Sequence, residues 1–142
     1  MTCVLLALLI AAPPAAESLE HVRKEPNLVK RSERALAFAD SSMARARQIV
    51  RDSGSRSELF DVLNQTVEAL DLSLRSLRET GKKASKLSKQ FKRGELRSRE
   101  IVRQLTDISV ALNIDDRPEA EKLRDRASLV HEEFLLGVMS GK

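Results

Sequence analysis

The stretch from Ser55 to Gly81 constrains the fold more than any other part of the chain. Its large apolar residues recur at steps of three and four, which places them along one stripe of an α-helix: Phe60, Leu63, Val67, Leu70, Leu74 and Leu77. Ser55 and Glu58 have the spacing of a capping box, and Gly81 suits a left-handed helix end. Further apolar residues between positions 59 and 72 widen the stripe, so we expect this helix to contact more than one neighbour.

Three other segments repeat this pattern, and short connections separate them. We therefore expect four long helices, over about 27–53, 56–80, 88–112 and 117–138. Gly54 is expected to end the first helix, and Gly137 with Gly141 to end the apolar pattern of the last, whereas Gly94 marks either a close backbone contact or a break. Whether residues 82–87 are helical is left open.

Short connections make consecutive helices antiparallel neighbours. The predicted fold is therefore all-α, an antiparallel up-down four-helix bundle, with a three-helix core plus a docked fourth helix as the alternative. This topology predicts that Phe91 and Phe134 share one layer near an end of the bundle. A single domain of 142 residues without Trp or Tyr, and with 42% hydrophobic residues, agrees with a helical core.

The amino-terminal segment has a different character from the bundle. Val4 to Ala12 is an apolar run, which Pro13-Pro14-Ala15-Ala16 follows before the first charge at Glu17. The run is too short to span a bilayer but suits the apolar part of a secretory signal. We interpret 1–16 as a secretory signal segment, 17–26 as a charged leader (a short helix or loose chain) and 27–142 as the bundle. An apolar tail that packs on the bundle is the alternative.

This interpretation predicts a periplasmic or extracellular protein. Cys3 is the single cysteine, so cleavage after Ala15 or Ala16 leaves a mature chain without cysteine. Disulfides and thiolate chemistry would then be excluded.

The sequence lacks the patterns that usually carry catalysis or bind metals. It has no Gly-rich phosphate loop, no His-Glu-x-x-His and no Cys-x-x-Cys. A di-iron bundle needs Glu-x-x-His twice, but Ser18 and Ser128 stand three residues before the two histidines. We therefore expect no catalytic residue, no metal site and no cofactor. His131 is interpreted as a boundary residue paired with a carboxylate.

The segment from Lys82 to Arg103 carries the strongest functional signal. It holds nine Lys or Arg residues against only Glu95 and Glu100, a local net charge of +7 in a chain of net charge +4. On a continuous helix, one band would contain the candidate residues for binding an anion or a partner: Lys82, Lys86, Lys89, Arg93 and Arg97. The competing interpretation is a solvated face whose charges pair with carboxylates of adjacent helices.

Several partners are compatible with such a band. Anionic lipid, an anionic envelope polymer or an acidic protein would suit an exported chain. The predicted export, and the absence of Tyr and Trp for base stacking, argue against nucleic acid. Near the carboxyl end, Leu135, Leu136 and Met139 exceed what one helix stripe can bury, so we expect either a homodimer contact or a contact with the 17–26 leader.

We therefore expect a non-enzymatic, exported helical bundle that acts as a binding or scaffolding module. Its basic helix face would contact anionic components of the cell envelope. The alternative function is an intracellular helical regulatory or nucleic-acid-binding module, in which the apolar amino terminus is structural.

Overall fold

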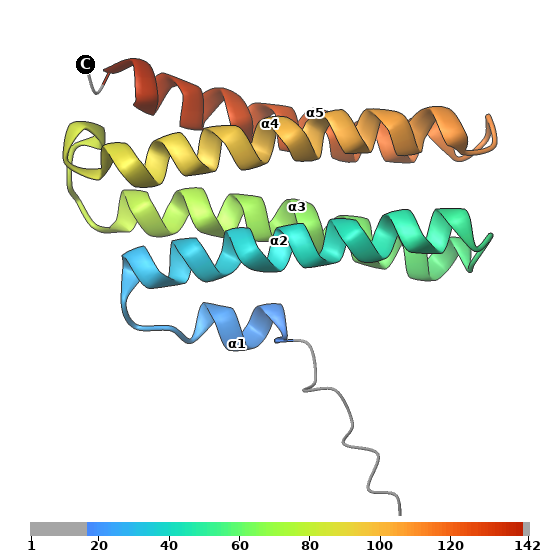
Figure 1. The fold of residues 1–142 in the computed structure, drawn as a ribbon, viewed down its shortest axis with the longest axis horizontal. Helices are drawn as coiled ribbons and strands as arrows, with labels where there is room; N and C mark the ends of the chain where they lie inside the picture. Colours follow the sequence, from blue (N-terminus) through green and yellow to red (C-terminus); the bar gives the residue numbers. More distant parts are fainter. Residues whose placement is uncertain (1–16, 141–142) are drawn as a thin grey trace, which may run out of the picture.

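The chain folds into an all-helical bundle in the computed structural model, which describes residues 17–140 (Figure 1). No strand occurs in this range. The elements are a short α1 (Leu19–Arg23), four long helices and one turn of 3-10 helix: α2 (Leu28–Arg51), α3 (Arg56–Glu79), η1 (Ala84–Leu87), α4 (Ser88–Ala111) and α5 (Arg117–Ser140). Each long helix begins and ends within about two residues of its expected range. The predicted signal segment, 1–16, lies outside the described residues.

Local signals in the sequence explain where several helices begin and end. The side chain of Asn27 accepts a hydrogen bond from the Lys30 amide, and that of Ser55 accepts one from the Glu58 amide, so α2 and α3 both have capped starts. Gly81 has a φ of 69°, as expected for the glycine that follows Thr80, the last cap residue of α3. The expectation for Gly54 is wrong, because Ser53 takes the left-handed conformation after α2, with a φ of 51°.

The four long helices form two hairpins that lie against each other. Successive long helices run in opposite directions, and the most extensive interfaces are α2 with α3 and α4 with α5 (Figure 1). The hairpins meet where α2 lies beside α4 and α3 lies beside α5. Contacts between α3 and α4 are sparse, so these two consecutive helices are not the close neighbours that their short connection predicted.

One hydrophobic core joins all five helices. Its fully buried large side chains come from every long helix and include Met43, Leu70, Leu105 and Phe134. This shared core does not match the alternative of a three-helix core with a docked fourth helix. The leader does form a short helix, α1, which buries Leu19 and Val22 against the first hairpin. Of the two alternatives for the apolar carboxyl end of α5, the contact with the leader is therefore not the one that the structure shows.

Two phenylalanines and two glycines interlock α4 with α5. The rings of Phe91 and Phe134 lie edge to face with centroids 6.0 Å apart, which confirms that they share a layer. A Cβ atom on Gly94 would lie 2.2 Å from the Phe134 ring, and one on Gly137 would lie 2.2 Å from the Phe91 ring. Both helices continue through their glycines, so Gly94 marks a close contact and Gly137 does not end α5.

Candidate functional site

The basic segment predicted to carry function begins in the connection between the two hairpins. After Gly81 the chain is irregular as far as Lys83, then forms η1, and α4 starts at Ser88. Leu87 and Phe91 are buried, and η1 packs against α5 and α4. These apolar anchors hold the segment against the bundle, while its lysine side chains are exposed.

The five candidate residues do not form the continuous helical band that the sequence predicted. Lys82 precedes η1 and Lys86 lies within it, so neither belongs to the α-helix that carries the other three. Lys89, Arg93 and Arg97 keep the expected four-residue spacing on α4. The sequence could not show this break, because a turn of 3-10 helix has the same composition as the first turn of an α-helix.

The two arginines of the band contact the neighbouring helix α2. Arg93 Nη1 lies 3.5 Å from Glu33, and Arg97 Nη1 lies 3.0 Å from Asp40. Burial raises the pKa of the Asp40 carboxyl above its ordinary value, and the charge of Arg97 offsets part of that rise. For Arg93 and Arg97, the interpretation as charges paired with an adjacent helix is therefore the better description.

The lysines of the same segment differ from its arginines. Within residues 17–140, ion pairs with carboxylates are absent for five exposed lysines, which we call the lysine segment: Lys82, Lys83, Lys86, Lys89 and Lys92. Their ammonium groups are thus available to an anionic partner without the loss of an existing contact. This division between lysine and arginine is not visible in the sequence, because it depends on which carboxylates α2 brings close.

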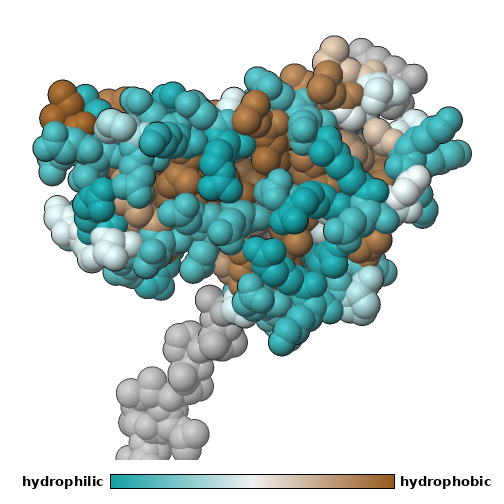
Figure 2. Space-filling model, turned by 180° about the vertical axis from the view of Figure 1, so that it is seen from behind, coloured by the Kyte–Doolittle hydropathy of each residue, from teal (hydrophilic) through white to brown (hydrophobic). Residues whose placement is uncertain are grey.

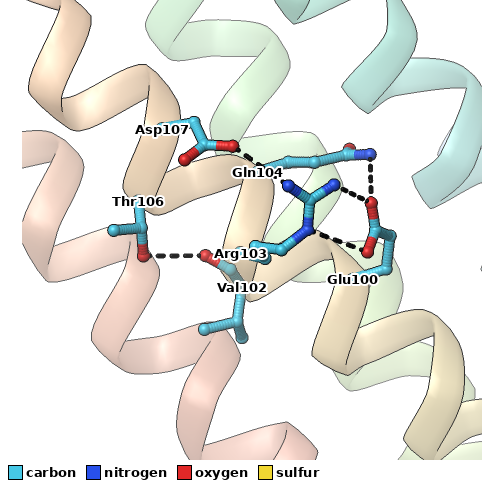
Figure 3. Close-up of polar contacts among 6 residues, drawn as sticks. All are labelled: Glu100, Val102, Arg103, Gln104, Thr106 and Asp107. Atoms are coloured by element: carbon cyan, nitrogen blue, oxygen red, sulfur yellow. Dashed lines mark hydrogen bonds and ion pairs between the residues drawn. The ribbon is translucent and has the colours of Figure 1, made fainter.

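The remaining arginines of α4 are engaged within their own helix. Arg103 donates to Glu100 at 2.5 Å and to Asp107 at 3.4 Å, and Gln104 also donates to Glu100 (Figure 3). Hydrogen bonding from Arg103 lowers the pKa of the Glu100 carboxyl. Such exposed pairs contribute little to stability, because solvent screens them, but they neutralise the charge of Arg103.

An exposed leucine lies among these charges. Leu96 is 57% exposed and borders a hollow of about 520 Å³ whose other lining residues are all charged: Lys89, Lys92, Arg93, Arg97 and Glu100. All six residues belong to α4, so the hollow lies between side chains of one helix. It is not a cleft between elements of the kind that encloses a small-molecule ligand.

His131 is paired across the second hairpin. Its Nε2 lies 3.3 Å from Glu95 Oε1, and the two side chains are 18% and 13% exposed. Burial by itself would raise the pKa of Glu95, but hydrogen bonds from Arg99 and His131 lower it below its ordinary value. His131 is thus a boundary residue bound to a carboxylate, as expected, although the carboxylate comes from α4.

The described helices carry neither a cluster of metal-ligating side chains nor a membrane span. In residues 17–140, no three His, Cys, Asp or Glu side chains are grouped so that they could hold a metal ion. Over the same range, no helix has the length and apolar content needed to cross a bilayer.

The carboxyl end of α5 exposes apolar side chains beside the lysine segment. Leu135, Leu136 and Met139 are 36%, 63% and 59% exposed. Seen from behind, hydrophobic side chains gather where α5 ends (Figure 2). These three side chains, which the sequence predicted to exceed the buried stripe of the helix, are therefore available for a contact outside the bundle.

Comparisons of the chain with protein-family models, curated proteins and solved structures give no match. The chemistry of the described surface is therefore the basis for assigning a function.

Proposed function

We propose that this chain is a non-enzymatic, exported helical-bundle module that binds anionic components of the cell envelope through its lysine segment. One observation carries the proposal: the arginines of α4 pair with carboxylates of α2 or of their own helix, whereas the five lysines have no such partner in the described range. A compact array of exposed ammonium groups attracts polyanions and anionic surfaces. The export part of the proposal rests on the apolar run and the small residues of 1–16.

The ion pairs of the basic segment guide our choice of residues for the proposed surface. Lys82, Lys86 and Lys89 remain its centre, and Lys83 and Lys92 join them. Arg93 and Arg97 lie at its edge, where they pair with carboxylates of α2. Replacing these arginines would leave Glu33 and Asp40 without their ion pairs as well as change the charge of the surface, and so they are poor choices for a binding test.

A charge-matched pair of triple variants tests the surface. Lys82→Gln/Lys86→Gln/Lys89→Gln removes three charges from the lysine segment. The control, Arg51→Gln/Lys122→Gln/Arg126→Gln, removes three exposed charges without ion pairs in the described range, and both variants change the net charge from +4 to +1. Binding is measured to vesicles in which about one third of the lipid is anionic phospholipid, and to soluble polyphosphate. Both measurements are repeated at several salt concentrations.

We expect the lysine variant to lose about 1 kcal/mol of binding free energy per lysine, or roughly a hundredfold in affinity for three. The affinity of the unmodified protein should fall as salt rises, because salt screens exposed charges. The control should bind nearly as well as the unmodified protein. Equal losses in the two variants, or no binding of the unmodified protein to either probe, would refute the assignment.

The export part has a separate test. Intact mass of the protein recovered from fractionated cells should show that residues 1–16 have been removed and that the product lies outside the cytoplasm. A full-length chain retained in the cytosol would refute export without affecting the result for the lysine segment.

A further inference from the structure

The last helix exposes more large apolar residues than any other long helix of the described range, four against the two of α4. Its inner face is buried in the core through Ala120, Leu123, Ala127, Val130 and Phe134. Its outer surface also exposes large apolar residues, and two of these lie near the carboxyl end, Leu136 at 63% and Met139 at 59% exposure. The bundle alone does not need these two side chains, because they contribute nothing to its core.

The structure places this apolar end next to the lysine segment. The Phe91 ring fills the space beside Gly137, so the end of α5 is fixed against the start of α4. η1, which contains Lys86, also packs against α5. Both features therefore lie at the same end of the bundle (Figure 1).

We propose that the anionic partner of the lysine segment is a bilayer surface, and that Leu136 and Met139 insert among its lipids. This inference rests on the proposed function and names the partner of the same site. Apolar side chains next to a group of lysines are the combination that holds proteins in the interface of an anionic membrane, because burial of apolar area adds to electrostatic attraction. A soluble polyanion would use the lysines and leave the apolar residues in water.

A second copy of the chain is a weaker candidate for covering this end. Stable protein interfaces bury about 1,200–2,000 Å² in total, which is far more than two or three side chains supply. A two-fold contact would also bring both lysine segments together, because the same surface is used on each copy. The repulsion between them would oppose the dimer, whereas anionic lipid neutralises the same charges.

The absence of Trp and Tyr from the chain allows a direct test. Leu136→Trp introduces a single tryptophan at the proposed insertion point. The control, Ile114→Trp, introduces one at the opposite end of the bundle, where Ile114 is 74% exposed. Full-length protein with each substitution is titrated with vesicles in which about one third of the lipid is anionic phospholipid. It is also titrated with vesicles of neutral phospholipid only and with soluble polyphosphate.

The emission of Leu136→Trp should shift to the blue with anionic vesicles, and brominated lipids should quench it. Neither change should occur with polyphosphate or with the Ile114→Trp control. Because the signal comes from α5 alone, binding through another part of the chain does not produce it.

A second pair of variants measures the contribution of insertion to binding. Leu136→Gln/Met139→Gln should weaken binding to anionic vesicles about tenfold or more, since two apolar side chains leave the lipid, and should leave polyphosphate binding unchanged. The control, Val110→Gln/Ile114→Gln, should change neither, because both residues lie at the far end and are exposed.

The outcomes separate the two proposals. Binding to both probes without a spectral shift at position 136, or binding to polyphosphate only, would overturn insertion and leave the lysine segment as an anion site. Binding to neither probe would overturn both. A blue-shifted tryptophan without lipid, together with a doubled mass in light scattering, would show that a second copy covers the apolar end.

Discussion

Gly94→Ala should destabilise the protein, although alanine is normally the better residue in a helix. In an unhindered helix interior the change would add about 1 kcal/mol of stability. Here the new Cβ would lie 2.2 Å from Cε1 and 2.4 Å from Cδ1 of Phe134, well inside van der Waals contact. Phe134 is fully buried, so a movement of its ring has to displace other core side chains.

The balance of the two effects gives the expected size. Overpacking of a core costs typically about 1–3 kcal/mol, and a contact this short belongs at the upper end of that range. After subtraction of the helix preference, Gly94→Ala should lower the free energy of unfolding by about 2 kcal/mol. For a domain of this size, that corresponds to a fall in Tm of roughly 4–8 °C.

Chemical denaturation of the unmodified protein and four variants tests this reasoning. The exposed Ala44 of α2 serves to measure the helix preference of alanine over glycine alone. Ala44→Gly should lower the free energy of unfolding by about 1 kcal/mol with no change in packing. Phe134→Leu frees space beside position 94. The double variant Gly94→Ala/Phe134→Leu should therefore lose less unfolding free energy than the two single variants lose in total. If Gly94→Ala raised stability by about 1 kcal/mol, the interlock would not exist as described.

Three further predictions concern local features of the bundle. Ser53→Gly should raise the free energy of unfolding by about 0.5–1 kcal/mol in urea denaturation, since glycine tolerates the left-handed φ of 51°. Asn27→Ala should lower it by about 1 kcal/mol through loss of the cap on α2, and Asn27→Ser should restore most of it. The folded pKa of Glu95 lies below its ordinary 4.5, so its stabilising effect is present above that value and is lost as the pH falls through the folded pKa. Glu95→Gln should therefore lose less stability than the unmodified protein as the pH falls below 4.5, and an equal loss would contradict the pairing of Glu95 with Arg99 and His131.

The sequence predicted the helices well, because the cause of each helix is local. The spacing of apolar residues from Phe60 to Leu77, and the caps at Asn27 and Ser55, act within one or two turns. The shared layer of Phe91 and Phe134 was also predictable, since antiparallel order and helix length fix which turns face each other. The roles of Gly94 and Gly137 were less accessible, because a glycine that accommodates a ring looks the same in the sequence as one that ends a helix.

The candidate site was predicted less completely than the fold. The sequence predicts Lys82 and Lys86 on the same α-helix as Lys89, but α4 begins only at Ser88, after both residues. The pairing of Arg97 with Asp40 depends on α2 lying beside α4. No local sequence pattern encodes which helix of one hairpin lies beside which helix of the other. The exposure of Leu136 was visible in the sequence only as an excess of apolar residues near the carboxyl end.

The arrangement of the helices as two hairpins has a consequence for how the chain reaches its native state. Each hairpin makes its largest interface between helices that are adjacent in sequence, and α1 rests on the first hairpin. During synthesis, α1, α2 and α3 are therefore complete before α4 emerges from the ribosome. Contacts of short sequence separation favour rapid folding, so the amino-terminal half should acquire protection from amide hydrogen exchange before the second hairpin docks onto it.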